Sequence, residues 1–176
     1  MIDAARLPYE ENVRETTNRT VTAQRAGLWV EAELGEIGGK GGAHASGART
    51  DPEEACAFVA STGVDGLAVS VRSTHALTTA GARLDLELLA RIAARVPLPL
   101  VLHGSSGVTR DGLEAAIRAG IRRINVGTAL NMAYTGEVRS VLDGDPRLTH
   151  PRLYLAPARA AVAQAVLRLA SIVQAP

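Results

Sequence analysis

The sequence contains few aromatic residues, one cysteine and almost no net charge. Aromatic side chains make up 3% of the 176 residues, too few for a surface on which single-stranded nucleic acid stacks. Nineteen basic side chains against eighteen acidic ones leave a formal charge of +1, without the basic excess of a nucleic-acid surface. Cys56 has no partner for an internal disulfide bond, which fits a reducing compartment. We therefore expect no nucleic acid among the partners.

Long apolar segments are also missing from the sequence. The first thirty residues carry charges throughout and lack the apolar stretch of a secretory signal. No apolar run approaches the length of a membrane span, so no membrane partner is expected. Hydrophobic residues still make up 47% of the composition, enough for one hydrophobic core. These properties predict a cytoplasmic protein in which residues 1–176 form a single domain.

The sequence does contain a regular alternation of short apolar runs and helix-like segments. The runs are rich in valine, isoleucine and leucine, which is typical of strands buried on both faces of a parallel sheet. Strands are expected to begin near residues 1, 28, 65, 98 and 121. Helices are expected over residues 10–26, 51–61, 84–96, 109–119, 128–142 and 156–173. This order predicts an α/β fold with a parallel sheet and right-handed crossovers.

Two architectures fit this alternation, a doubly wound sheet and part of a (β/α)8 barrel. A polar residue lies at or just past the end of every expected strand: Asp3, Glu33, His75, His103 and Asn125. Polar groups at the carboxyl ends of successive strands are what the active face of a barrel requires. Residues 38–42 (GGKGG) match neither a dinucleotide-binding pattern nor a P-loop. Because a complete barrel needs about 250 residues, we predict a partial barrel with about five of the eight units.

Two histidines are candidate metal ligands. His75 and His103 each follow a strongly apolar strand. A single histidine at a strand end is more often a structural hydrogen-bonding residue, but two on neighbouring strands can converge on one cation. Glu31 and Glu33 fall on the same side of their strand, and inside a barrel they would need a partner. A polar edge strand is the alternative interpretation of this segment.

Small residues after two of the strands favour phosphate binding. Residues 103–107 (HGSSG) and 125–128 (NVGT) expose backbone N–H groups, and the helix that follows each loop adds its positive dipole end. Phosphate sites after the last two strands recur in barrels. Since glycine- and serine-rich turns are common, the adjacent pair of loops supports this interpretation better than either loop alone.

Five segments together resemble the class II, zinc-dependent ketose-bisphosphate aldolases, in particular the fructose- and tagatose-bisphosphate aldolases. The segments are residues 7–12 (LPYEEN), 30–35 (VEAELG), 62–69 (TGVDGLAV), 101–107 (VLHGSSG) and 124–128 (INVGT). They run through nearly the whole chain, and their combination is highly specific. The resemblance implies a (β/α)8 barrel, of which this chain supplies the fourth strand onward.

The resemblance also implies roles for particular residues. His75 and His103 match two of the three zinc histidines of the family, and Glu33 and Asp3 match acids near a second cation position. The substrate-binding positions of the family are matched here by Gly104, Ser106, Asn125, Gly127 and Thr128. They would hold the phosphate and dihydroxyacetone portion of a phosphorylated sugar. The zinc ion would polarise its ketone and so lower the cost of carbon–carbon bond cleavage.

One element of the family's motif set is missing from the sequence. The third zinc histidine and the catalytic aspartate form an Asp-His pair in the family, and this chain has no Asp-His dipeptide. The pair is expected to precede Met1, so the chain alone should be impaired as an enzyme. Two alternatives stay open: a non-catalytic half-barrel that binds a sugar phosphate, and a partner subunit of an aldolase complex. We expect a homo-oligomer or a barrel completed by another chain.

Overall fold

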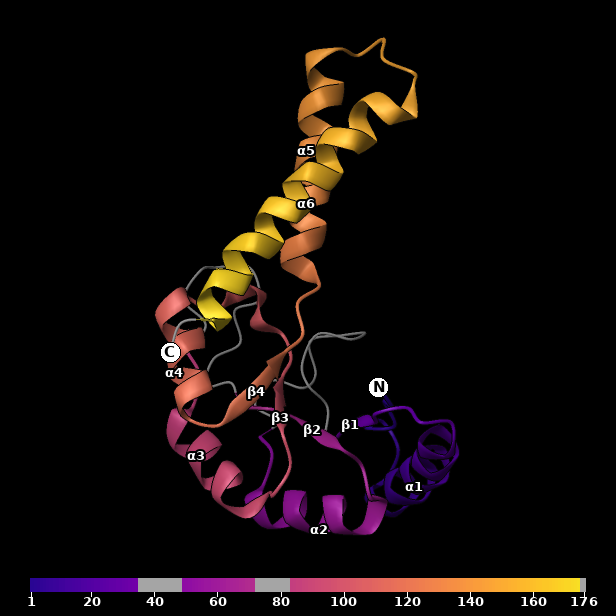
Figure 1. Ribbon diagram of the computed structural model, residues 1–176, viewed down its shortest axis with the longest axis vertical. Coiled ribbons are helices and arrows are strands. Elements are labelled where there is room, and N and C mark those ends of the chain that lie inside the picture. The colour runs from indigo at the N-terminus through magenta and orange to yellow at the C-terminus, as the bar shows by residue number, and fades with distance from the viewer. Residues whose placement is uncertain (35–48, 72–82, 175–176) are drawn as a thin grey trace. The chain divides into compact units, whose positions relative to one another are not determined.

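The fold is built on a parallel sheet in which the strands follow one another in chain order (Figure 1). The computed structural model describes residues 1–34, 49–71 and 83–174. The four strands are β1 (Glu31–Glu33), β2 (Gly66–Val69), β3 (Leu100–Leu102) and β4 (Ile121–Ile124). All three strand pairs are parallel, and the order is β1-β2-β3-β4. The sequential order confirms the barrel-type arrangement, because a doubly wound sheet would reverse its order part-way.

The strand expected at the N-terminus is reduced to one bridge. Ile2 pairs with Ala32 of β1 in parallel, and its N–H group donates to the Glu31 carbonyl at 2.7 Å. The first three residues are therefore placed beside β1, as the prediction required. A single bridge replaces the expected strand.

Three of the first four helices begin at a capping side chain, and the second helix ends at a left-handed glycine. They are α1 (Tyr9–Arg25), α2 (Pro52–Thr62), α3 (Leu86–Arg95) and α4 (Arg110–Arg118). Side chains of Asp51, Asp85 and Thr109 accept hydrogen bonds from first-turn N–H groups of α2, α3 and α4. Gly63 ends α2 with a φ of 65°, in the left-handed region that glycine adopts without strain. The Asp85 cap explains why α3 begins two residues later than residue 84, the predicted start.

The hydrophobic core lies between the sheet and the helices α2–α4. Leucine side chains of β2 and β3 and the first isoleucine of β4 are almost completely buried, as are aromatic and aliphatic side chains of α2 and α3. The largest of these side chains belong to Phe58, Leu67, Leu89, Ile92, Leu100, Leu102 and Ile121. Figure 1 shows these helices along the outer side of the strands. The polar residues of β1 and those at the strand ends lie on the opposite face of the sheet.

A register shift between β3 and β4 decides which residues of β4 face that polar side. Leu100 pairs with Ile121, but the next residue, Val101, pairs with Arg123. Arg122 is therefore the extra residue of a bulge, which re-aims the side chains that follow it. As a result Arg123 lies on the same face of the sheet as Val101. Asn125, two positions later, lies on that face as well.

The chain divides into two compact units, residues 1–125 and residues 126–176. The second unit consists of α5 (Thr128–Gly144) and α6 (Pro151–Val173), which pack against each other. The predicted helix at residues 156–173 thus begins earlier, with Pro151 in the first turn and Pro157 inside the helix. Proline fits the first turn because its missing N–H group has no helical partner there. A single domain over residues 1–176 stays a prediction.

One expectation about apolar segments is corrected by α6. Within residues 1–34, 49–71 and 83–174, this is the one helix that is long and apolar enough to cross a membrane. The sequence was expected to have no segment approaching that length. The criterion uses length and composition alone, and helices of soluble proteins also meet it. Two arginines inside the helix, Arg159 and Arg168, would each be costly in hydrocarbon.

Candidate functional site

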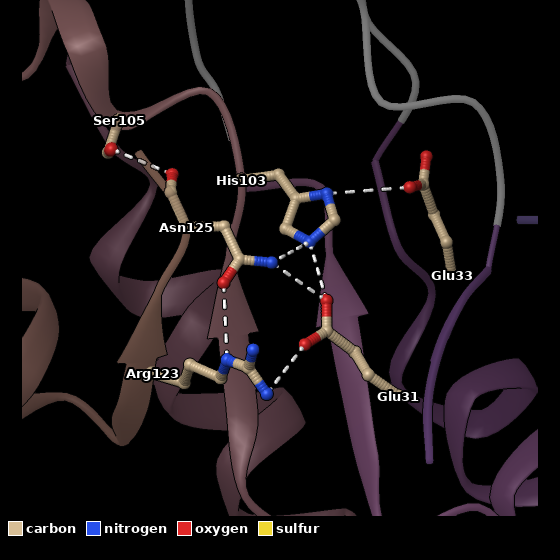
Figure 2. Close-up of polar contacts among 6 residues, drawn as sticks. All are labelled: Glu31, Glu33, His103, Ser105, Arg123 and Asn125. Atoms are coloured by element: carbon tan, nitrogen blue, oxygen red, sulfur yellow. Dashed lines mark hydrogen bonds and ion pairs between the residues drawn. The ribbon is translucent and has the colours of Figure 1, made fainter. Parts of the chain in front are cut away.

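The candidate site lies at the carboxyl ends of the parallel strands, where four polar side chains meet (Figure 2). Glu31 and Glu33 come from β1 and share one face because successive strand residues alternate. His103 directly follows β3, and Asn125 directly follows β4. The sequence predicted that Glu33, His103 and Asn125 would lie at one end of the sheet, and the structure places them together there.

Glu31 is the centre of this cluster. Its side chain is 2% exposed, and a buried carboxylate is costly unless donors surround it. Oε1 accepts a hydrogen bond from Asn125 Nδ2 at 2.9 Å and lies 2.8 Å from His103 Nε2. Nδ2 and Nε2 are themselves 2.9 Å apart. A proton on Nε2 lets both nitrogens donate to one oxygen, whereas a bare Nε2 would set its lone pair against the carboxylate.

Arg123 completes the surroundings of the Glu31 carboxylate. Its Nη1 lies 3.4 Å from Oε2, and its Nε donates to Asn125 Oδ1 at 3.2 Å. Among the described residues Oε2 has no hydrogen-bond partner, so the contact with Arg123 is an ion pair without hydrogen-bond geometry. The guanidinium group thus contacts both the carboxylate and the amide of the site (Figure 2).

His103 lies between two carboxylates. On the side opposite Glu31, its Nδ1 is 3.4 Å from Glu33 Oε2. The hydrogen bond to Glu33 is the largest cause that raises the pKa of His103 above its usual value of 6.5. Burial acts in the opposite direction, and Glu31 adds to the increase. The raised pKa favours an imidazolium that donates to both glutamates.

We expect Glu33→Gln to lower the pKa of His103 in the metal-free chain, because a neutral amide stabilises the imidazolium less than a carboxylate. A titration of the His103 ring signals by NMR measures this change. In the wild type the folded pKa lies above the unfolded value, so the contribution of His103 to stability is present below the unfolded pKa. It is lost as the pH rises through the folded pKa. Glu53→Gln, on α2, is the control and should leave the titration unchanged; an equal shift in both variants contradicts this assignment.

Of the other two residues predicted at a cation, Asp3 is described by the structure and His75 is not. Asp3 follows Ile2, the bridge partner of Ala32, so its backbone lies beside Glu33 at the edge of the sheet. His75 lies outside the described residues, so its distance from His103 is not addressed. Roles for both residues at a cation stay predictions.

The loop after β3 has the backbone geometry expected of a tight turn. Gly104 has a φ of 62°, and a short 3-10 turn covers Ser105–Gly107. The buried Ser105 hydroxyl donates to the Asn125 carbonyl at 3.1 Å, which ties the ends of β3 and β4 together. Ser106 is exposed in the same turn. Phosphate binding by Gly104 and Ser106 stays a prediction.

The second predicted phosphate loop is divided between the two units. Asn125 ends the first unit, whereas Gly127 and Thr128 belong to the second. Gly127 is the N-cap of α5 and Thr128 its first residue, and no side chain caps this helix. Backbone N–H groups of the first turn are therefore not occupied by a capping side chain.

Comparisons with known proteins show the family to which the chain belongs. The family model "Fructose-bisphosphate aldolase class-II" matches residues 1–175. The chain belongs to this aldolase family. Among solved structures it is similar to the YdjI aldolase from Escherichia coli K12, with 31% identity and a TM-score of 0.75. That match covers 99% of this chain and 59% of the other chain.

Two further structures support the same fold. A proposed fructose-1,6-biphosphate aldolase from Coccidioides immitis is 30% identical with a TM-score of 0.77, covering 98% of this chain and 61% of the other. Fructose-bisphosphate aldolase from Campylobacter jejuni shares 21% identity and a TM-score of 0.75, with coverages of 97% and 59%. This aldolase-family chain thus spans about three fifths of the length of each. The prediction of a partial (β/α)8 barrel is confirmed.

The residues of the site fit part of a zinc centre. An imidazole and a carboxylate face each other at His103 Nδ1 and Glu33 Oε2, and both are ordinary zinc ligands. In the described part of this aldolase-family chain, no group of three histidine, cysteine, aspartate or glutamate side chains could hold a metal ion. The chemistry of the pair therefore fits zinc, and a complete centre needs at least one further donor.

Sequence reasoning missed three residues of this site. Glu31 was expected only to need a partner, and neither Arg123 nor Ser105 was assigned a role. The signal for Glu31 was present, because alternation places it beside Glu33. The position of Arg123 depends on the bulge in β4, and the sequence carries no sign of it.

Proposed function

We propose that this chain is part of a zinc-dependent class II aldolase that reversibly cleaves a ketose 1,6-bisphosphate, fructose or tagatose, to dihydroxyacetone phosphate and an aldehyde. The observation that carries the proposal is the convergence of Glu31, Glu33, His103 and Asn125 at one end of the sheet of an aldolase-family chain. The name of the similar structure from Coccidioides immitis, which is 30% identical and refers to fructose bisphosphate, supports that substrate class.

Each residue of the site has a separate proposed role. His103 and Glu33 would hold the zinc ion, with His75 as the further imidazole, and the ion would supply positive charge that polarises the substrate ketone. Asn125 would donate a hydrogen bond from Nδ2 to a substrate oxygen. Glu31 keeps both His103 Nε2 and Asn125 Nδ2 in place through its Oε1. The N–H groups of the loop at residues 104–107 would bind a phosphate group.

We expect His103→Ala to weaken zinc binding by more than the roughly 10–100-fold that loss of an outer-shell partner costs, because it removes a ligand. Competition with a chromophoric chelator at constant pH measures the affinity without any need for turnover. His150→Ala is the matched control, since His150 lies at the N-cap position of α6, in the other unit, and makes no side-chain cap hydrogen bond there. Equal zinc affinity of His103→Ala and the wild type would contradict the assignment.

The reaction itself is tested by following the release of dihydroxyacetone phosphate through a coupled reduction. Fructose and tagatose 1,6-bisphosphates are supplied in parallel, with and without zinc. Because the chain lacks an Asp-His pair, the proposal expects slow cleavage that requires zinc and disappears in His103→Ala. Zinc-independent cleavage, or equal rates in the variant, would overturn it.

A second candidate function is a sugar-phosphate-binding subunit without turnover. The lack of an Asp-His dipeptide in this chain favours it, because the family's acid–base pair is then not supplied by these residues. Such a subunit would bind dihydroxyacetone phosphate and complete its barrel with another chain. Binding without cleavage, together with gain of activity on mixing with a second chain, would distinguish it from the enzyme.

A further inference from the structure

Arg123 contacts two side chains of the site and one aromatic ring, and no sequence pattern predicted these contacts. Its Nε donates to Asn125 Oδ1 at 3.2 Å, and its Nη1 lies 3.4 Å from Glu31 Oε2. The other side of the guanidinium meets Trp29, with Cζ 5.1 Å from the ring centroid. A cation over an indole face at this distance is an attractive contact. Arg123 therefore contacts both Trp29, which precedes β1, and the side-chain amide of Asn125, which follows β4.

The backbone explains why the ring and the guanidinium can meet. Trp29 packs over Gly66 of β2, where an added Cβ would lie 2.5 Å from two atoms of the ring. Glycine at this position leaves the space that the indole occupies. The bulge at Arg122 then places Arg123, two residues before Asn125, on the same face of the sheet.

We propose that Arg123, held against Trp29, is a positioning residue that fixes the orientation of the Asn125 side-chain amide. The inference rests on the proposed function in one respect, namely that Asn125 donates to a substrate oxygen. Two contacts of the amide define one orientation, since Oδ1 faces the Nε donor of Arg123 and Nδ2 faces the Oε1 acceptor of Glu31. The third contact, between Nδ2 and His103 Nε2 at 2.9 Å, lies on the same side as Glu31 Oε1. A flipped amide would set two donors together at Arg123 and two acceptors together at Glu31.

The consequence is that Asn125 presents N–H rather than C=O beside His103 and Glu31. A ligand oxygen that accepts a hydrogen bond is favoured there, as in the carbonyl or hydroxyl group of a phosphorylated ketose. Without the guanidinium, Oδ1 would lose its donor and the amide could take either orientation. Arg123 would then affect ligand binding without touching the ligand.

The test is the side-chain amide signal of Asn125 in ¹H–¹⁵N NMR spectra of the metal-free, full chain, assigned with Asn125→Ser. Arg123→Met keeps an unbranched side chain beside the indole but removes every donor. We expect it to move the Asn125 amide signals and the fluorescence of Trp29, which is the single tryptophan of the chain. Because the Arg123 side chain is half exposed, the substitution removes little buried surface.

Arg122→Met is the matched control, since the neighbouring guanidinium donates to the carbonyls of Ile117 and Ile121 instead. It should leave the Asn125 and Trp29 signals as in the wild type. Arg123→Lys is the second variant: an ammonium group retains the charge but lacks the planar fork, so it should not restore the Asn125 signals. Unchanged Asn125 signals in Arg123→Met, or equal changes in Arg122→Met, would overturn the proposal.

Binding of dihydroxyacetone phosphate separates this inference from the proposed function. We expect Arg123→Met to weaken it about fivefold to tenfold, the effect of disturbing one hydrogen bond, and Arg122→Met to leave it unchanged. A wild-type chain that does not bind this ligand would contradict the proposed function, while the amide signals would still decide the positioning role. Unaltered affinity in Arg123→Met, with measurable wild-type binding, would overturn the role of Arg123 in presenting the amide.

Discussion

A longer version of this protein that includes the family's Asp-His pair is expected to cleave the proposed ketose-bisphosphate substrate about 10²–10⁴-fold faster than the 176-residue chain. The factor is the typical loss when a positioned acid–base group is missing. The pair would also add a zinc ligand to the His103 and Glu33 side of the site. The additional strands would exclude water, and electrostatic stabilisation is stronger in a closed site. Initial rates with saturating zinc, measured by the coupled release of dihydroxyacetone phosphate, provide the comparison.

The control for this comparison is the longer version with the aspartate of the pair replaced by asparagine. It restores the barrel strands but not the acid–base group, so it separates the effect of a complete fold from the effect of the chemistry. Its rate is expected to lie between those of the two versions, because the zinc ligand and the additional strands are restored but the acid–base group is not. Comparable turnover from the short and long versions would show that the site is complete without the Asp-His pair.

Replacement of Phe58 by alanine is expected to lower the free energy of unfolding by about 3–5 kcal/mol, the usual cost for a buried phenylalanine. Phe58 lies on α2, is completely buried, and packs with its ring 6.4 Å from that of Tyr9. Truncation leaves a cavity where α1 and α2 meet. Urea unfolding followed by the fluorescence of Trp29 reports on this unit, because Trp29 is its single tryptophan.

Leu28→Ala serves as the control for the stability measurement. Leu28 is 60% exposed, and substitutions at such positions usually change stability by no more than about 0.5 kcal/mol. A loss below about 1 kcal/mol for Phe58→Ala, or an equal loss for Leu28→Ala, would contradict the expected contribution of the buried Phe58 ring to the stability of this unit.

Much of the fold could be predicted because its signals are local. The Asp51 and Thr109 side chains cap α2 and α4 at the expected positions, and Gly63 ends α2. Caps and left-handed glycines act within one helical turn, so a short stretch of sequence contains the whole interaction. The start of α6 was less well predicted, since the turn-rich stretch around Pro146 and Pro151 favoured a later start, whereas Pro151 is the first residue of the helix.

The candidate site was predicted as a set of strand-end residues but not as a network of contacts. Strand alternation and the apolar runs placed Glu33, His103 and Asn125 at one edge of the sheet. The raised pKa of His103 arises from Glu33 and Glu31, which are 70 and 72 positions away in the sequence. Such a shift depends on distances across three strands, and the separation of residues along the chain does not give those distances.

The sequence by itself determined which segments become strands and helices, because hydrophobic periodicity, caps and turn glycines are properties of neighbouring residues. It also determined that polar groups would gather at the carboxyl ends of the strands. Only the tertiary structure decided that Arg123, and not the adjacent Arg122, faces Glu31 and Asn125. The two arginines are equivalent in local sequence, and the choice between them comes from a one-residue register shift against β3. A shift of one residue turns a strand side chain to the other face, and only the pairing with the neighbouring strand fixes it.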